Sequence, residues 1–137
     1  MISDFEAADG IYIVQGKHQL DLHNNFAFEE VRYSVVDRTV SLRWTRRPED
    51  WVPPDSPATI RLTFEGVLEF RFVGRDPKMP ITEDDCLHTM GYLTDEAWSK
   101  GNVVETKKPE PDWLTAFAFQ SGAVIAVRAE RATAQIG

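Results

Sequence analysis

The sequence is poor in the features that indicate a secreted or membrane protein. Its one cysteine, Cys86, has no partner for a disulfide within the chain. No run approaches the ~18 apolar residues that span a membrane as a helix, and the acidic start, MISDFEAADG, lacks the apolar core of a signal peptide. We therefore expect a soluble protein of a reducing compartment, with a bacterial cytoplasm as its setting.

Positive charge is also scarce. The chain has 15 Lys and Arg against 22 Asp and Glu, which gives a net charge of −7 at pH 7. This balance argues against nucleic acid and anionic membranes as main partners, because both repel an acidic surface. A protein partner with a basic surface remains compatible with it.

The common catalytic and cofactor motifs are missing as well. There is no glycine-rich phosphate loop before a helix, no nucleophile elbow and no helix with paired zinc-binding histidines, so we expect no cofactor. Cys86 and His88 are two positions apart on a predicted helix, where they would point in different directions. The sequence favours a protein that is not an enzyme, with an enzyme of dispersed site residues as an alternative.

Two groups of metal-binding side chains are incomplete. Asp21 and His23 would share a strand face, but His18 would not, and a further ligand would have to come from elsewhere. The acidic run Glu83–Asp85 lacks the alternating oxygen ligands and the glycine of a calcium loop. The electrostatics of a first helical turn accounts for it. We predict no metal site.

What the sequence does contain is a hydrophobic period of two residues over most of its length, which is typical of β-strands. Its 137 residues, 42% of them hydrophobic, fit one domain, 1–137, that can bury a core. Two short strands are expected at Ile11–Val14 and Gln19–Leu22, joined by a turn at Gly16. Further along the chain, Gly66 marks a bulge or bend within one long strand.

Two hairpins are predicted. The first turns at Asp37 and Arg38, which would place Tyr33 and Trp44 in the core and pair Val35 with Val40, Tyr33 with Leu42 and Val31 with Trp44. The second turns at Ser121 and Gly122, with Phe119 opposite Val124. Both of its faces are largely apolar, so its strands should lie centrally and be covered on two sides.

A short helix is predicted near residues 83–90, because Thr82 can cap it and three acidic residues follow in its first turn. A short strand is expected at Val103–Glu105. Together these elements predict a mainly β fold: an antiparallel β-sandwich or partly open β-barrel of seven to nine strands with one short capping helix.

Three arginines are candidate binding residues. In the predicted register Arg32 lies opposite Arg43 on the outer face, and Arg61 has the outward phase of the next strand. Like charges opposite each other are destabilising, so Glu30, Glu65 or Glu69 should neutralise them in a cross-strand ladder. The alternative is an arginine stripe that binds an anionic ligand or an acidic partner.

The proline-rich stretch RRPEDWVPPDSP carries the fourth candidate, Trp51. The structural interpretation is that Trp51 and Val52 fold back as an apolar plug over one end of the core. The functional one is that Trp51 anchors a partner, because tryptophan is enriched at interface hot spots. The exposure of the indole separates the two.

These observations favour a small non-enzymatic binding or interaction protein, such as an immunity-type stoichiometric partner of another protein. The alternative is a small-molecule carrier with an apolar cavity between the sheets, its mouth formed by Trp51 and Trp98. A homodimer is also left open. It would form if the small-residue face of the last hairpin were not covered by the segment Met79–Trp98.

Overall fold

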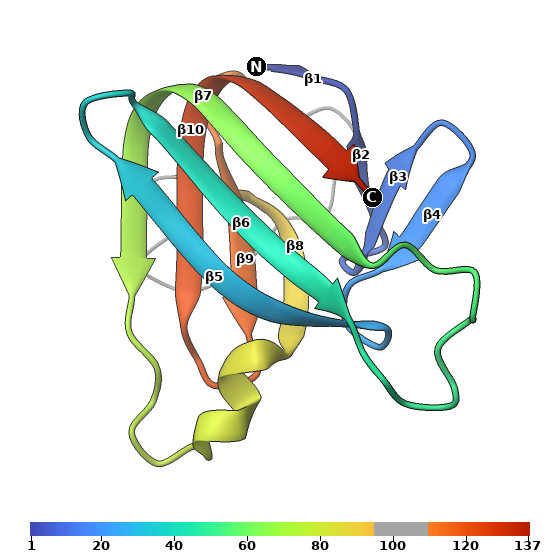
Figure 1. Ribbon diagram of the computed structural model, residues 1–137. Coiled ribbons are helices and arrows are strands. Elements are labelled where there is room, and N and C mark those ends of the chain that lie inside the picture. The colour runs from blue at the N-terminus through green and yellow to red at the C-terminus, as the bar shows by residue number, and fades with distance from the viewer. Residues whose placement is uncertain (95–109) are drawn as a thin grey trace.

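The computed structural model describes residues 1–94 and 110–137, which form ten β-strands and one 3-10 helix (Figure 1). In chain order they are β1 (Ile2–Ser3), β2 (Glu6–Ala8), β3 (Tyr12–Gln15), β4 (His18–Asp21), β5 (Phe26–Ser34), β6 (Thr39–Arg46), β7 (Thr59–Val73), η1 (Ile81–Asp85), β8 (Leu87–Leu93), β9 (Leu114–Phe119) and β10 (Val124–Ile136). No helix within these residues has the length and apolar character needed to cross a bilayer.

The main sheet has the strand order β5-β6-β7-β10-β9-β8, and β1 adds to it in parallel beside β10. It curls into a half-barrel whose edge strands, β5 and β8, do not pair with each other (Figure 1). Strands β2, β3 and β4 form a small second sheet. The mainly β prediction is therefore confirmed in its partly open form. It missed strands because β1 and β2 are too short to show a period.

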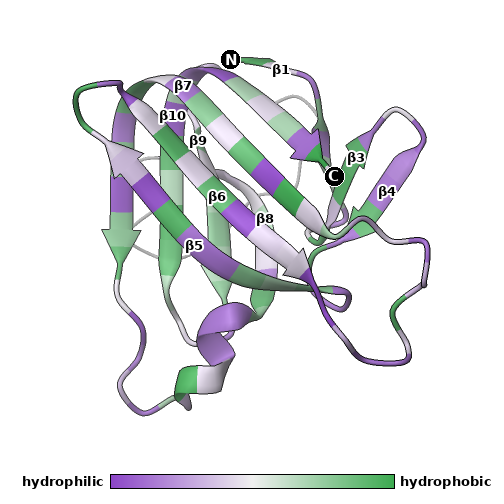
Figure 2. Cartoon of the chain, viewed as in Figure 1, coloured by the Kyte–Doolittle hydropathy of each residue, from purple (hydrophilic) through white to green (hydrophobic). Residues whose placement is uncertain are grey.

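Alternation of side chains builds the core. Along β6 the residues Val40, Leu42 and Trp44 are buried while their neighbours are partly exposed, and Figure 2 shows this as alternating colours along the strand. Trp44 and Phe117 lie with ring centroids 5.8 Å apart inside the curl. The burial of Trp44 confirms its predicted core position.

Gly66 is where β7 bends. The residue has φ 63°, and the register between β7 and β10 shifts between Arg128 and Ala129, directly opposite this region. Strand β7 continues through the bend to Val73. The predicted bulge is confirmed, and it lets one long strand follow the curl of the sheet.

The register of the first hairpin differs from the prediction by two residues. Tyr33 lies opposite Val40 and Val31 opposite Leu42, because the turn contains four residues, 35–38. A shift of two keeps every side chain on its predicted face. The prediction that Tyr33 belongs to the core is nevertheless wrong: its side chain is 46% exposed, because it stands near the end of an edge strand.

The last hairpin is shifted by one residue. A three-residue turn, closed by a hydrogen bond from Phe119 N to Ala123 O, places Phe117 opposite Ile125. Ile125 and Val127 therefore join Phe117 in the main core rather than facing away from it. The other face holds a second buried cluster of Leu93, Leu114, Ala116 and Ala126. Burial on both faces was predicted correctly, but the membership of each face was not.

The predicted short helix is present, but as a 3-10 turn at Ile81–Asp85 rather than over residues 83–90. The helical turn ends at Asp85, and the chain then enters β8, which pairs with β9 from Leu87 to Leu93. Pairing with a free strand edge satisfies the backbone of this segment and overrides its helix-cap signal. The segment thus extends the sheet instead of covering a face of it. The strand expected at Val103–Glu105 and the candidate residue Trp98 lie outside the described residues.

Candidate functional site

The strongest candidate site lies at the open side of the half-barrel, which we call the seam, beside the edge strand β5. A cleft of about 590 Å³ opens between the edge strand β5, the end of β7, η1 and the β9–β10 turn. We call it the seam cleft. Its lining residues are Phe28, Glu29, Glu30, Val31, Phe72, Gly74, Arg75, Ile81, Thr82, Asp84, Asp85, Phe119, Ala123 and Ile125.

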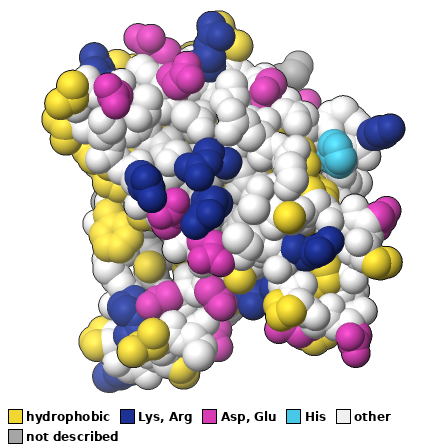
Figure 3. Space-filling view, in the orientation of Figure 1, with side chains coloured by type: hydrophobic (Ala, Val, Ile, Leu, Met, Phe, Trp, Pro, Cys, Tyr) yellow, Lys and Arg dark blue, Asp and Glu magenta, His cyan; other side chains and the backbone are white. Residues whose placement is uncertain are grey.

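The floor of the seam cleft is apolar. The rings of Phe28 and Phe119 lie 4.7 Å apart at its inner end. Nearer the opening, Phe72 is 57% exposed and Ile81, on η1, is 77% exposed. Large apolar side chains that gather in one concave place mark a binding surface more often than isolated exposed ones do. Figure 3 shows hydrophobic side chains collected along the margin of the molecule on that side.

Ion pairs hold η1 at the rim of the seam cleft. Arg75 Nε donates to both carboxylate oxygens of Asp84, at 3.0 and 3.1 Å, and Arg75 Nη2 donates to Met79 O at 2.6 Å. The pKa of Asp84 is lowered chiefly by a hydrogen bond from Ser121, and burial opposes this shift. The hydrogen bond and the charge of Arg75 lower it further. This carboxylate therefore links η1 both to the end of β7 and to the β9–β10 turn.

A second pair fixes the other end of η1. Arg47 Nη2 lies 3.1 Å from Asp85 Oδ1, and the arginine side chain is largely buried. The acidic run Glu83–Asp85 thus supplies two ion-pair partners. Within residues 1–94 and 110–137 no group of three or more His, Cys, Asp or Glu side chains could hold a metal ion.

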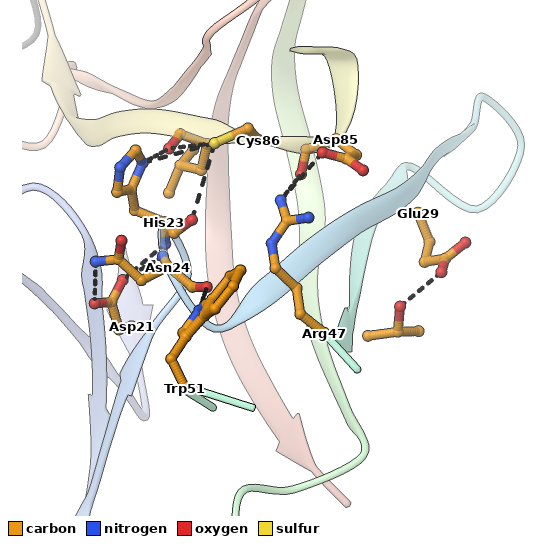
Figure 4. A network of polar contacts seen from close by, with 10 residues as sticks. Asp21, His23, Asn24, Glu29, Arg47, Trp51, Asp85 and Cys86 are labelled. Carbon is orange, nitrogen blue, oxygen red and sulfur yellow. Dashed lines mark hydrogen bonds and ion pairs between the residues drawn. The ribbon is translucent and has the colours of Figure 1, made fainter. Parts of the chain in front are cut away.

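His23 and Cys86 come together beside this pair (Figure 4). Cys86 Sγ lies 3.8 Å from His23 Nδ1, and the same nitrogen contacts the carbonyl oxygen of Leu87. A carbonyl oxygen only accepts hydrogen bonds, so Nδ1 carries a proton and is not free to take one from the thiol. Burial raises the pKa of the Cys86 thiol, against the opposing charge of Arg47. The contact therefore does not form a nucleophile–base pair.

His18, Asp21 and His23 do not come together as metal ligands. Asp21 accepts hydrogen bonds from the backbone N–H groups of His23 and Asn24 and so closes the turn after β4. His23 points to Leu87, while His18 is exposed on β4. Asp21 and His23 therefore have structural contacts of their own.

Trp51 is an exposed side chain with a fixed orientation. Its indole Nε1 donates to Asn24 O at 3.0 Å (Figure 4), and the residue is 64% exposed. The neighbouring Val52 is 6% exposed. The predicted plug is therefore correct for Val52 and wrong for Trp51. The proline-rich loop buries its valine and presents its tryptophan.

The arginine ladder on the outer face is confirmed for two residues. Glu30 lies 3.2 Å from Arg32 Nε and 3.4 Å from Arg43 Nε. The shifted register places Arg32 opposite Ser41, and Arg43 instead lies directly opposite Arg61. Among the described residues, Arg61 has no carboxylate within 4 Å.

Sequence reasoning did not find the seam cleft. Its residues come from four segments that meet only because the sheet curls, and a two-residue period does not reveal curvature. Phe70 and Phe72 are two positions apart on one strand, so the sequence places both on the same inner face. The sequence does not show whether other side chains pack against that face or leave a cleft.

No protein-family model matches the chain, and neither the curated proteins nor the solved structures that were searched gave a match, so the seam cleft is interpreted from its geometry alone.

Proposed function

We propose that this chain is a non-enzymatic binding protein that takes a small apolar ligand in the seam cleft. The observation that carries the proposal is the concave apolar surface formed by Phe28, Phe72 and Ile81 at the open seam. Its volume of about 590 Å³ falls within the roughly 300–1,000 Å³ of small-molecule sites. The cytoplasmic setting expected from the sequence is part of the same proposal.

The charges at the rim favour an uncharged ligand. Each rim carboxylate already has a partner in the protein: Glu29 with Thr45, Glu30 with Arg32 and Arg43, Asp84 with Arg75, and Asp85 with Arg47. A ligand with a charged group would have to compete with these pairs. An apolar ligand gains from contact with the floor without disturbing them.

A neutral fluorescent probe, N-phenyl-1-naphthylamine, tests this function. We expect its emission to rise and shift to the blue on binding, with saturation at one probe per chain. Phe72→Asp should weaken binding by about tenfold or more, because it removes apolar contact worth about 1.5–3 kcal/mol and places a charge beside the ligand. The side chain is exposed, so the variant should fold.

Val36→Asp is the matched control, because Val36 is 93% exposed in the β5–β6 turn and does not line the seam cleft. It should bind the probe like the parent protein. Equal weakening by both variants, or no saturable binding by the parent, would show that the seam cleft is not a ligand site.

A second candidate function is favoured by Trp51, which is exposed and oriented by its hydrogen bond to Asn24. An indole held in place loses little entropy on binding, as expected of an anchor for a protein partner. The overall charge of −7 suits a basic partner surface. This candidate is the interaction protein, of immunity type or otherwise, that the sequence favours.

Affinity capture with three baits, the parent protein, Val36→Asp and Trp51→Ala, tests the second candidate. A partner that uses Trp51 should be retained by the parent protein and by Val36→Asp but lost with Trp51→Ala. The same order should hold when the purified partner is titrated against each bait. A partner retained equally by all three baits does not depend on the indole.

A further inference from the structure

The outer face of the main sheet carries a block of four hydrogen-bond donors. Arg43 lies opposite Arg61, and two residues away on the same strands Ser41 lies opposite Thr63. All four side chains share the outward phase, because the alternating residues Leu42 and Leu62 are buried. Arg61 Nη1 reaches diagonally toward Ser41 Oγ, at 3.5 Å. We call this group the arginine block.

Charge is not balanced at the arginine block. Arg32 and Arg43 share one carboxylate, that of Glu30, and Arg61 has none within 4 Å among the described residues. Counted together with the neighbouring Arg32 and Glu30, the arginine block has a net charge of +2 on a protein whose overall charge is −7. Figure 3 shows Lys and Arg side chains grouped near the centre of this face, in front of β5–β7.

The guanidinium groups also have unused hydrogen-bonding capacity. Arg43 Nε is buried and has no hydrogen-bond partner: Glu30 Oε1, 3.4 Å away, does not meet hydrogen-bond geometry. Directly opposed like charges and a buried unpaired donor each cost stability. An anion seated between the two arginines would relieve the repulsion between their charges.

We propose that the arginine block binds a phosphate group. A phosphate carries close to two negative charges at neutral pH, which matches the net charge of +2, and has several oxygens to accept hydrogen bonds. Two guanidinium groups bind such oxygens through paired N–H donors, and the Ser41 hydroxyl, 3.5 Å from Arg61 Nη1, adds a further donor. None of the four side chains of the arginine block lines the seam cleft, although Glu30, which does, pairs with Arg43.

A carboxylate fits the arginine block less well. It brings one charge and two oxygens, so it would satisfy one guanidinium and leave the other unpaired. Nucleic acid and anionic lipid also present phosphate, but the negative charge over the rest of the surface opposes both. The ligand we infer is therefore a small phosphate compound or phosphate itself.

NMR titration with inorganic phosphate tests the proposal. Sodium chloride keeps the ionic strength constant, so that screening does not change during the titration. We expect the Nε–Hε signals of Arg43 and Arg61, and the amide signals of residues 41–43 and 61–63, to shift together and to saturate. Shifts that stay linear over the whole titration, or that occur elsewhere, would overturn the proposal.

Three variants sharpen the test. Arg61→Gln should weaken phosphate binding by about tenfold or more, because it removes a charge-assisted donor pair. Arg61→Lys keeps the positive charge but lacks the paired N–H donors of a guanidinium group, so it should weaken phosphate binding by an intermediate factor. Arg128→Gln, the matched control, removes one positive charge from an arginine already paired with Glu69 and should bind like the parent. Equal weakening by Arg61→Gln and Arg128→Gln would mean that only net charge attracts the anion.

Discussion

Gly66 is the residue on which the curl of the main sheet depends. Its φ of 63° lies in the left-handed region, which costs other residues about 1–2 kcal/mol. A Cβ at this position would also lie 2.6 Å from Glu130 Oε2 and 3.0 Å from Glu130 Cβ. Only glycine avoids both the backbone strain and the clash with β10.

Gly66→Ala should therefore lower the free energy of unfolding by about 2–3 kcal/mol, measured by urea denaturation. Gly16→Ala is the control: φ is 58° there as well, but nothing lies within 4 Å of the added Cβ. It should cost only the backbone strain, about 1–2 kcal/mol. Equal losses in the two variants would show that the approach of Glu130 carries no cost.

Cys86 is predicted to be a slow nucleophile. Burial raises the pKa of its thiol above the ordinary 9.0, so at pH 8 less thiolate is present than in an unfolded peptide. Alkylation by iodoacetamide should show an inflection above pH 9 in the native protein and a lower one in denaturant. Arg47→Gln should raise the inflection further, because Arg47 favours the thiolate. An inflection below 9.0 in the native protein would contradict this prediction.

At the residue scale, the sequence predicted correctly those features that depend only on residues nearby in the chain. The buried Trp44 and the bend at Gly66 were both found, because a strand period reports them directly. Three features were not found: the contact of His23 with Cys86, the exposure of Trp51, and the absence, among residues 1–94 and 110–137, of an acid within 4 Å of Arg61. Each depends on segments distant in sequence.

At the scale of elements, η1 is held by its side chains rather than by its length. It has five residues, buries none of them, and has no side-chain cap. Arg75 and Ser121 bind Asp84, while Arg47 binds Asp85. The position of η1 at the rim of the seam cleft therefore depends on two carboxylates staying ionised.

The pKa of Asp84 lies below its ordinary 3.8, which fixes the sign of its contribution to stability. That contribution is complete above about pH 4 and is lost as the pH falls through the lower folded-state pKa. Ser121→Ala should move the pKa of Asp84 up toward 3.8 and make the loss of stability below pH 4 less steep. Carboxyl ¹³C shifts measure the pKa, and urea unfolding measures the stability. An unchanged Asp84 pKa in this variant would contradict the assigned hydrogen bond.

The errors at this scale have a common cause. Both hairpin registers were wrong because both turns were predicted with two residues, whereas the first has four and the second has three. The end of the helix predicted at 83–90 became a strand because β9 offers a pairing edge, which local sequence signals do not reveal. The positions of most strands along the sequence were predictable, but the strands with which they pair were not.

At the scale of the whole molecule, β7 and β10 form one continuous ladder from Val73 opposite Val124 to Ile60 opposite Ile136. Both strands run through the bend at Gly66 and so contribute to the sheet on either side of it. Amide protons on either side of Gly66 should therefore exchange through the same global opening, with one shared free energy. Native-state hydrogen exchange would contradict this if the segments 59–65 and 67–73 opened with clearly different free energies.

The position of β10 has a consequence for the protein while it is being made. This strand follows all the others in sequence, yet it lies in the middle of the main sheet, between β7 and β9, and also receives β1. Until the ribosome releases residues 124–136, β7 and β9 lack the strand that joins them in the main sheet. We therefore expect the nascent chain to complete its main sheet, and to lose sensitivity to proteases, only after residues 124–136 have emerged.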